Sequence, residues 1–412
     1  MNIQIFPPEG MLEASVDLPL SKSMSARALV INKTGGFDTS LELSDSEDTR
    51  LLAEGIARRD GEVNVGNAGT AMRFLTAYFA ATEGVEVVLD GTDRMRERPI
   101  APLVEALRGL GAEIEYVANE GFCPIRIKGR RLRGGSINVD ATTSSQFVSA
   151  LMMVAPLMDG ALSLCFDTEI ASLPYVKMTA AMMTACGIEP EFMYNRIEVP
   201  NTPYTKPVTR IERDWSAASY WYSIVALSAG WVTLNDMQLQ SVQGDSVMQT
   251  LGEKIGVVTS ESEEVEDALE LSASPEQFSR LDLDMSGHPD LVPTIAIAAG
   301  ALGIPFRMTG VHTLRKKETD RLEALRAEAL KLGLIFEIER DNVLSWEGTR
   351  VPITELPVIS TYNDHRMAMA FAPISIFLPG IIIENCEVVS KSYPGFWSDL
   401  ENAGFEIKQI IE

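Results

Sequence analysis

The chain has 412 residues, of which 46% are hydrophobic and 23% are charged, and its formal net charge at pH 7 is −23. Because this length exceeds the roughly 250–300 residues at which a single hydrophobic core stops growing, we expect two domains. The composition excludes a disordered chain, and the negative charge excludes non-specific nucleic-acid binding, which depends on clustered Lys and Arg.

The cysteines and the apolar segments restrict the class of protein further. Four cysteines lie far apart without any C-x-x-C pair, so we expect neither a zinc ribbon nor a disulfide framework. The first residues, MNIQIFPPEG, lack the pattern of a secretory signal. The longest apolar stretch, 368–383, contains two prolines and is too short to span a bilayer. These features predict a cytoplasmic protein with no membrane span.

Helices with polar starts and apolar bodies recur along the chain, separated by short strand-like runs. The helices are expected at 25–34, 70–82, 145–158, 216–230, 291–302 and 366–377, and the strands at 85–89, 137–139, 161–166, 232–234 and 381–388. A helix that is apolar on all faces must be buried on all sides, here between sheets. Two amphipathic helices, 99–111 and 317–333, are expected at the surface. The pattern predicts an α/β fold with an internal repeat of about 60 residues.

Several cations in this acidic chain lie in helix starts rich in Ser, Thr, Gly and Asn. They are Lys22, Arg27, Arg73, Arg321 and Arg366. A helix start offers unpaired N–H groups and the positive end of the helix dipole, so a cation and a hydroxyl added there favour an anion. One such segment alone is more often a capped helix with solvated cations. Five of them together predict a site for several anionic groups.

Nine segments, in chain order, resemble the successive signatures of the EPSP synthase family. They are LSKSMSARAL, GNAGTAMRFL, RMRERPIAPLVEAL, SSQFVSAL, SLPYVKMT, GHPDLVPT, RKKETDRL, TYNDHRMAM and SKSYPGFW, between residues 20 and 397. The resemblance implies an inside-out α/β barrel of two domains, each with three βαβαββ units and buried helices. One domain would be discontinuous, 1–20 plus 213–412, and the other, 21–212, would be inserted into it. The active site would lie in the cleft between them.

The resemblance also implies an activity, the transfer of the enolpyruvyl group of phosphoenolpyruvate to the 5-hydroxyl of shikimate 3-phosphate. The residues that match the family's shikimate 3-phosphate site are Lys22, Ser23, Arg27, Ser144, Ser145, Gln146, Ser172, Tyr175, Asp290 and Lys317. Those that match its phosphoenolpyruvate site are Lys22, Gly69, Arg98, Gln146, Arg321, Arg366 and Lys391. The arginine forks suit both the carboxylate and the phosphate.

The chemistry needs one group that takes the hydroxyl proton and one that protonates the enol methylene. The family's carboxylates for these roles are Asp290, as the base, and Glu318, as the acid, with Lys22 also catalytic; the proton assignment stays open. Asn67 and His365 are expected to support the site. We expect no cofactor and no metal, although Asp282, Asp284, His288 and Asp290 could suggest a metal site, and we expect a monomer.

Three departures from the family pattern bear on inhibitor binding and stability. Most relatives have a longer segment where this chain has 51–65, so one structural unit is expected to be trimmed. Phe74 stands where the family usually has proline, and Thr313 stands where many relatives have asparagine. Relatives with glycine at the Gly69 position are generally sensitive to glyphosate, so we expect sensitivity, with Phe74 as the residue that could alter it.

Two other functions are compatible with the same fold. The sister family that transfers enolpyruvyl to UDP-N-acetylglucosamine typically uses a reactive cysteine in a mobile basic loop, and Cys123 precedes an apparent strand instead. A relative that binds anions without turnover would not need the carboxylates Asp290 and Glu318. Both features favour the shikimate 3-phosphate enzyme.

Overall fold

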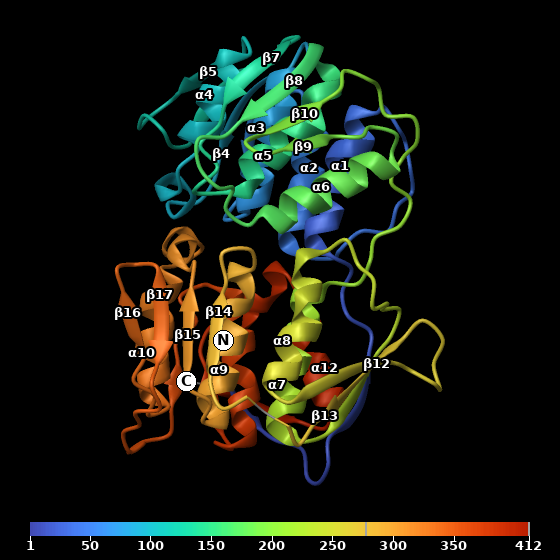
Figure 1. Cartoon of the computed structure of the whole chain (residues 1–412). Coiled ribbons are helices and arrows are strands. Elements are labelled where there is room, and N and C mark those ends of the chain that lie inside the picture. Colours follow the sequence, from blue (N-terminus) through green and yellow to red (C-terminus); the bar gives the residue numbers. More distant parts are fainter. Residues whose placement is uncertain (277, 411–412) are drawn as a thin grey trace. The chain divides into compact units, whose positions relative to one another are not determined.

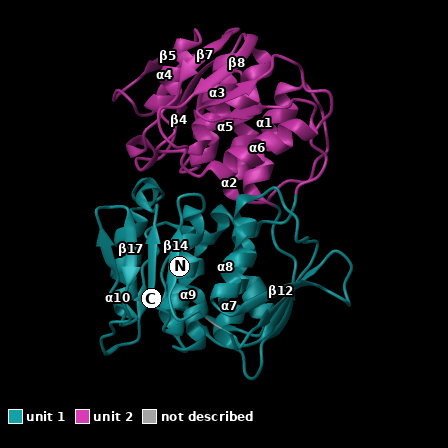
Figure 2. Ribbon diagram, viewed as in Figure 1, with its two compact units in different colours: residues 1–20, 212–412 teal, residues 21–211 magenta. Residues whose placement is uncertain are grey.

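The computed structural model describes residues 1–276 and 278–410 (Figure 1). Contacts within the chain divide it into two compact units (Figure 2). Unit 1 comprises Met1–Leu20 and Glu212–Glu412, and unit 2 comprises Ser21–Ile211. The boundaries expected from the sequence place Glu212 in the other domain, and residues 411 and 412 of the expected discontinuous domain lie outside the described residues.

Unit 2 contains two complete βαβαββ units. The elements of the first are β3 (Asp60–Asn64), α3 (Gly69–Ala81), β4 (Glu86–Asp90), α4 (Ala101–Gly109), β5 (Glu113–Tyr116) and β6 (Ile125–Lys128). Those of the second are β7 (Arg133–Asn138), α5 (Ser145–Val154), β8 (Asp159–Cys165), α6 (Leu173–Ala185), β9 (Glu191–Met193) and β10 (Arg196–Val199). The sheet orders are β3-β4-β6-β5 and β7-β8-β10-β9. In each sheet the first two strands are parallel, because a helix crosses over between them, and the other pairs are antiparallel.

The third repeat of unit 2 retains its helices without a sheet. It contains α1 (Lys22–Thr34) and α2 (Glu47–Ile56), and within the described chain no strand is assigned between residues 21 and 59. An antiparallel strand pair follows both α4 and α6, whereas α2 leads after residues 57–59 directly into β3. The expectation of three full units in this domain is therefore too high, because the short segment 51–65 has no room for the hairpin.

Unit 1 contains three complete repeats. Their strands are β1 (Asn2–Phe6), β2 (Glu13–Val16), β11 (Trp231–Leu234), β12 (Val257–Glu261), β13 (Leu269–Ala273), β14 (Leu281–Asp284), β15 (Phe306–Thr309), β16 (Glu337–Glu339), β17 (Val343–Trp346), β18 (Val358–Ile359), β19 (Ile381–Ile383) and β20 (Glu406–Ile410). The sheet orders are β12-β13-β11-β2, β14-β15-β17-β16 and β18-β19-β1-β20. Strands β1 and β2 thus complete two sheets whose other strands come from the second half of the chain, which is why this unit is discontinuous.

The apolar helices form the cores of both units. The helices of unit 1 are α7 (Trp215–Ser228), α8 (Met248–Lys254), α9 (Val292–Leu302), α10 (Arg321–Lys331), α11 (His365–Phe371) and α12 (Phe396–Asn402). Helices α7, α9 and α11 contact one another and are buried along almost their whole length, as are α3 and α5 in unit 2. Helices inside and sheets outside confirm the predicted inside-out α/β architecture (Figure 1). Across the described residues, no helix is both long and apolar enough to cross a membrane.

Two predicted elements are wrong in their extent, and both differences matter for the site. The strand predicted at 381–388 ends at Ile383, because Asn385 adopts a left-handed conformation (φ 48°) and a 3-10 helix, η7 (Cys386–Lys391), follows. The helix predicted at 317–333 begins only at Arg321, because the side chain of Asp320 caps it by accepting from the Glu323 amide. Residues 317 and 318 therefore lie in the loop before the helix.

Candidate active site

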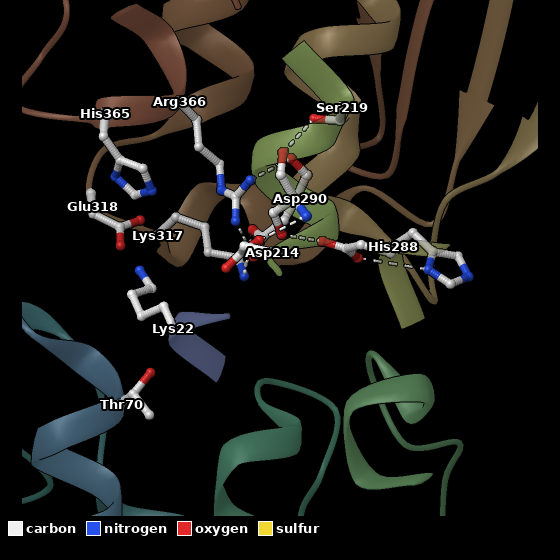
Figure 3. Close-up of polar contacts among 12 residues, drawn as sticks. Lys22, Thr70, Asp214, Ser219, His288, Asp290, Lys317, Glu318, His365 and Arg366 are labelled. Atoms are coloured by element: carbon white, nitrogen blue, oxygen red, sulfur yellow. Dashed lines mark hydrogen bonds and ion pairs between the residues drawn. The ribbon is translucent and has the colours of Figure 1, made fainter. Parts of the chain in front are cut away.

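A cluster of charged side chains in unit 1 gathers at the starts of the buried helices and at the end of η7. Figure 3 shows its members Asp290, Lys317, Glu318 and Arg366. Asp290 lies on the short 3-10 turn η4 (Pro289–Leu291) that leads into α9, and Asp364 caps α11. The members of the cluster are Asp290, Lys317, Glu318, Arg321, Asp364, Arg366 and Lys391. Segments between Asp290 and Lys391 in the sequence thus bring four cations and three carboxylates together.

Arg321, the first residue of α10, is the centre of this cluster. Its side chain is 1% exposed, and each of its three nitrogens donates to a carboxylate. Nε donates to Asp364 Oδ2 at 2.6 Å, Nη1 to Asp290 Oδ1 at 2.8 Å and Nη2 to Glu318 Oε2 at 2.8 Å. Charge-assisted bonds of this kind raise the pKa of the guanidinium against the effect of its burial. Arg321 therefore fixes all three carboxylates in place.

Asp290 is held in its ionised form by three cations. Besides Arg321, Arg366 Nη2 donates to Oδ2 at 3.1 Å, and Lys317 Nζ lies 3.3 Å from Oδ1. Burial alone would raise the pKa of Asp290, but the charges of Arg366, Lys317 and Arg321 outweigh it and hold the pKa well below its usual range. Asp290 is thus a carboxylate that can accept a proton.

Glu318 is placed between two cations by the loop before α10. Arg321 binds one of its oxygens, and Lys391 Nζ donates to Oε1 at 3.0 Å. Arg366 donates in addition to the Tyr220 hydroxyl at 3.4 Å, and burial raises the pKa of that tyrosine to about 12. Because four cations face three carboxylates, the cluster keeps an excess of positive charge in a strongly acidic chain. Such an excess favours an anionic ligand.

The sequence reasoning missed one residue of the cluster, Asp364, and one residue that contacts it, Tyr220. Asp364 was passed over, although its place immediately before an apolar helix is a capping signal, and its side chain accepts from the Arg366 amide at 3.0 Å. Tyr220 carried no signal, because it lies within the all-apolar helix α7. His365, predicted as a supporting residue, is buried with Nδ1 3.7 Å from Asp364 Oδ1. Thr313 is buried on a 3-10 turn four residues before Lys317.

The other predicted residues lie in unit 2, most of them at the starts of the helices α1, α3, α5 and α6. Arg98 lies between η1 (Met95–Glu97) and α4, and Arg27 lies within α1. Lys22 is the first residue of α1, which Ser21 caps, and its Nζ donates to Asp48 Oδ2 at 3.2 Å. Ser23 follows it and is partly buried. The Lys22 ammonium thus lies at the positive end of a helix, with one carboxylate against it.

Gly69 and Arg98 form a tight pair at the start of α3. A β-carbon on Gly69 would lie 2.7 Å from Arg98 Nη2 and 2.8 Å from Arg73 Nη1, so only glycine lets both guanidiniums approach the backbone. Arg98 is 9% exposed, and within the described residues its Nε and Nη1 have no hydrogen-bond partner. Asn67, two residues before Gly69, is partly buried. A buried guanidinium with unused donors is prepared to bind an anion.

The start of α5 is joined to the start of α3. Gln146 Nε2 donates to Thr70 Oγ1 at 2.9 Å, and Ser144 caps α5 by accepting from the Gln146 amide at 3.2 Å. Ser145 is buried beside them. Thr70 is a further residue that the sequence reasoning missed, although it follows Gly69 directly.

Ser172 and Tyr175 stand at the start of α6. Ser172 adopts a left-handed conformation (φ 54°), which is uncommon for a residue with a side chain, and its hydroxyl makes no capping bond to the helix. The Tyr175 side chain is partly buried, and its carbonyl accepts from Arg27 at 3.2 Å. The hydroxyl of Ser172 is therefore not used by the helix that it precedes.

The residues that could suggest a metal site have separate partners. Asp282 pairs with Arg280, Asp284 accepts from the Ser286 amide, and His288 faces Asp245 at 3.9 Å. Throughout 1–276 and 278–410, no group of three or more His, Cys, Asp or Glu side chains is arranged to hold a metal ion. The arrangement of the site instead suits organic anions.

Together, the buried helices and the cationic clusters at their starts define an anion-binding α/β protein built from βαβαββ repeats. The family model described as EPSP synthase (3-phosphoshikimate 1-carboxyvinyltransferase) matches residues 41–400. The chain belongs to the EPSP synthase family.

Known proteins of this family are similar in sequence to almost the whole chain. A 3-phosphoshikimate 1-carboxyvinyltransferase of Bacteroides fragilis is 45% identical over 400 residues, covering 96% of this chain and 97% of that protein. One of Methanospirillum hungatei is 34% identical, covering 94% and 95%. A solved EPSP synthase structure from Acinetobacter baumannii superposes with a TM-score of 0.72 at 19% identity, covering 99% and 100% of the two chains. At that identity the superposition shows the fold.

Proposed function

We propose that this protein transfers the enolpyruvyl group of phosphoenolpyruvate to the 5-hydroxyl of shikimate 3-phosphate, giving 5-enolpyruvylshikimate 3-phosphate and phosphate in aromatic amino acid biosynthesis. The observation that carries the proposal is the cluster around Arg321, where excess positive charge surrounds two carboxylates suited to proton transfer, Asp290 and Glu318. Two relatives at 45% identity, each called 3-phosphoshikimate 1-carboxyvinyltransferase, match 96% of this chain and support the same reaction.

The two substrates use residues of both units in this proposal. Shikimate 3-phosphate would bind Lys22, Ser23, Arg27, Ser144, Ser145, Gln146, Ser172, Tyr175, Asp290 and Lys317. Phosphoenolpyruvate would bind Lys22, Gly69, Arg98, Gln146, Arg321, Arg366 and Lys391. Ligand atoms would then take the place of some internal contacts, such as the Lys391 to Glu318 bond. The unused donors of Arg98 and the uncapped Ser172 support these assignments.

The proposed chemistry is an addition followed by an elimination. The 5-hydroxyl oxygen attacks C2 of phosphoenolpyruvate while its proton passes to Asp290, and C3 takes a proton from Glu318, to which Lys391 can supply one. In the tetrahedral ketal phosphate, the bond from C2 to the phosphate oxygen then breaks, and the leaving phosphate takes the proton held by Asp290. Glu318 takes back one proton from C3, which restores the enol double bond. Because its neighbours stabilise the ionised form, Asp290 is a weak base that accepts the proton only as the C–O bond forms.

The alternative acceptor, UDP-N-acetylglucosamine, receives less support. Its enzymes typically use a reactive thiolate, whereas burial raises the pKa of Cys123 to about 11 and the side chain is 3% exposed. An anion-binding protein without turnover would not need Asp290 and Glu318 so firmly positioned. One assay distinguishes the proposed activity from transfer to UDP-N-acetylglucosamine and from anion binding without turnover.

The experiment measures inorganic phosphate released from phosphoenolpyruvate with shikimate 3-phosphate, or with UDP-N-acetylglucosamine, as acceptor. We expect release with shikimate 3-phosphate only. Release with UDP-N-acetylglucosamine would assign the sister activity, and none with either would favour a binding protein. In a third reaction we expect glyphosate to inhibit, because Gly69 leaves the Arg98 guanidinium close to the backbone.

Replacing Arg98 with alanine should raise the KM for phosphoenolpyruvate about 100-fold and change that for shikimate 3-phosphate less than threefold, because one fork of the anion clamp is lost. Steady-state kinetics with each substrate varied would measure both values. Arg94→Ala is the matched control, because Arg94 lies on the same segment, is 36% exposed and pairs with Glu97. Equal effects on both substrates would contradict the assignment of Arg98.

The dependence of kcat/KM on pH should show the loss of the proton from Lys317. Burial lowers the pKa of this lysine, partly opposed by Asp290, so its charge is lost at a pH below its usual value of about 10.4. We expect kcat/KM to fall as pH rises through the lowered pKa, whereas stability should rise there, because the unfolded chain still binds the proton. In Lys317→Arg the fall should move to higher pH. An unchanged alkaline limb would exclude Lys317 as its source.

The remaining parts of the proposal concern location and assembly. We propose that the protein is a cytoplasmic monomer that needs no cofactor. Its net charge of −23 makes copies of the chain repel one another, which favours the monomer. Light scattering at low and high salt should give a mass near 45.1 kDa. A dimer at physiological salt would contradict the monomer.

A further inference from the structure

Arg27 connects the buried helices of unit 2. Its side chain is 2% exposed, and its Nε donates to Thr179 Oγ1 at 2.7 Å. Nη2 donates to Ser149 Oγ at 3.4 Å and to the Tyr175 carbonyl at 3.2 Å, while Nη1 donates to the Ser23 carbonyl at 2.8 Å. These partners lie on α6, α5 and α1, so one guanidinium connects three helices.

Phe74 brings the fourth helix into this arrangement. It lies on α3, one turn after Gly69 and Thr70, and is fully buried. The guanidinium carbon of Arg27 lies 5.5 Å from the centre of its ring. Burial disfavours the charged form of Arg27 and lowers its pKa to about 10. The attraction between an aromatic ring and a cation above it offsets part of the hydration free energy that the buried cation loses.

The hydrogen bonds of Arg27 and the ring of Phe74 act on different helices. The bonds hold α1, α5 and α6, whose starts carry the residues assigned to shikimate 3-phosphate, whereas Phe74 belongs to α3, whose start carries Gly69. Within the described residues, the guanidinium of Arg27 donates its hydrogen bonds to α1, α5 and α6 and none to α3. The ring is therefore its contact with that helix.

We propose that Phe74 is a positioning residue for substrate binding, which acts through Arg27 to fix the start of α1 against the start of α3. This inference rests on the proposed function for its kinetic readout only. Since proline has no aromatic ring to place under a guanidinium, the phenylalanine gives this chain a link that the usual residue of the family cannot make.

The kinetic test compares two substitutions of one kind in one helix. Phe74 and Phe79 are both fully buried on α3, but Phe79 contacts the Tyr78 ring, with no cation placed over it among the described residues. We expect Phe74→Leu to raise the KM for shikimate 3-phosphate about tenfold, and Phe79→Leu to change it less than twofold, at similar losses of stability. Equal KM values in the two variants would overturn the proposal.

A second measurement does not depend on the activity. In a double-mutant cycle of urea unfolding, Phe74→Leu should destabilise the protein about tenfold less, in unfolding equilibrium constant, when Arg27→Met is already present. Additive effects would overturn the contact between Arg27 and Phe74. If the cycle shows coupling but the wild-type protein releases no phosphate with shikimate 3-phosphate, the proposed function fails and the contact stands.

Discussion

Arg321→Met should destabilise unit 1 by about 3–5 kcal/mol and abolish turnover. The arginine is 1% exposed and donates to three carboxylates, Asp290, Glu318 and Asp364, which would lose their shared partner in a partly desolvated cluster. Removing one member of a buried ionic network costs this much because the remaining charges stay buried. Methionine is similar in length and apolar, so the loss would reflect charge more than volume.

Equilibrium unfolding in urea, followed by circular dichroism, would measure this effect. Arg326→Met is the matched control, because Arg326 lies on the same helix but is 53% exposed and pairs only at the surface with Glu323. We expect the control to change stability by less than about 1 kcal/mol. Adding Asp364→Asn to Arg321→Met should recover part of the loss. A variant Arg321→Met with wild-type stability would show that the network is not strongly coupled.

Glu318→Gln should lower kcat by about 10²–10⁴-fold with small changes in both KM values. The substitution keeps the size of the side chain and an oxygen that can accept from Arg321, so position and fold should persist. It removes the group proposed to protonate C3, and proton transfer by a positioned side chain contributes an acceleration of this size. The effect should therefore appear in turnover rather than in binding.

Steady-state kinetics on the folded variant would test this role. Glu323→Gln, on α10 shortly after the loop of Glu318 and 40% exposed, is the control, and we expect its kcat to stay within twofold of wild type. If Glu318→Gln kept a near-normal kcat, another group would have to supply the proton. If it raised both KM values at unchanged kcat, Glu318 would be a binding residue only.

The local pattern of the sequence was sufficient for the architecture. Helices such as 291–302, apolar on every face, can exist in water only when buried, so their number and spacing predicted helices inside sheets. The polar starts of these helices likewise predicted that Lys22, Arg321 and Arg366 bind anions. The positive end of the helix dipole and a cation placed there both attract negative charge.

The sequence predicted less well where each helix begins and ends and which side chains contact one another. The apolar spacing of 317–333 predicted one helix, but the capping bond of Asp320 delays its start until Arg321, so that Lys317 and Glu318 lie in a loop. The spacing of apolar residues indicates which face of a helix is buried, but it does not indicate at which residue a capping side chain makes the helix begin. The trimmed repeat was visible as a short segment, whereas the missing sheet was not.

The sequence by itself therefore determined the alternation of elements, the burial of the central helices and the family, and it predicted most of the charged residues of the candidate site. Only the tertiary structure decided which charges meet: that Arg321 binds Asp364, 43 residues away, and that Arg27 lies over Phe74. The physical reason is that burial follows from local composition, whereas a contact between distant residues depends on how whole helices pack.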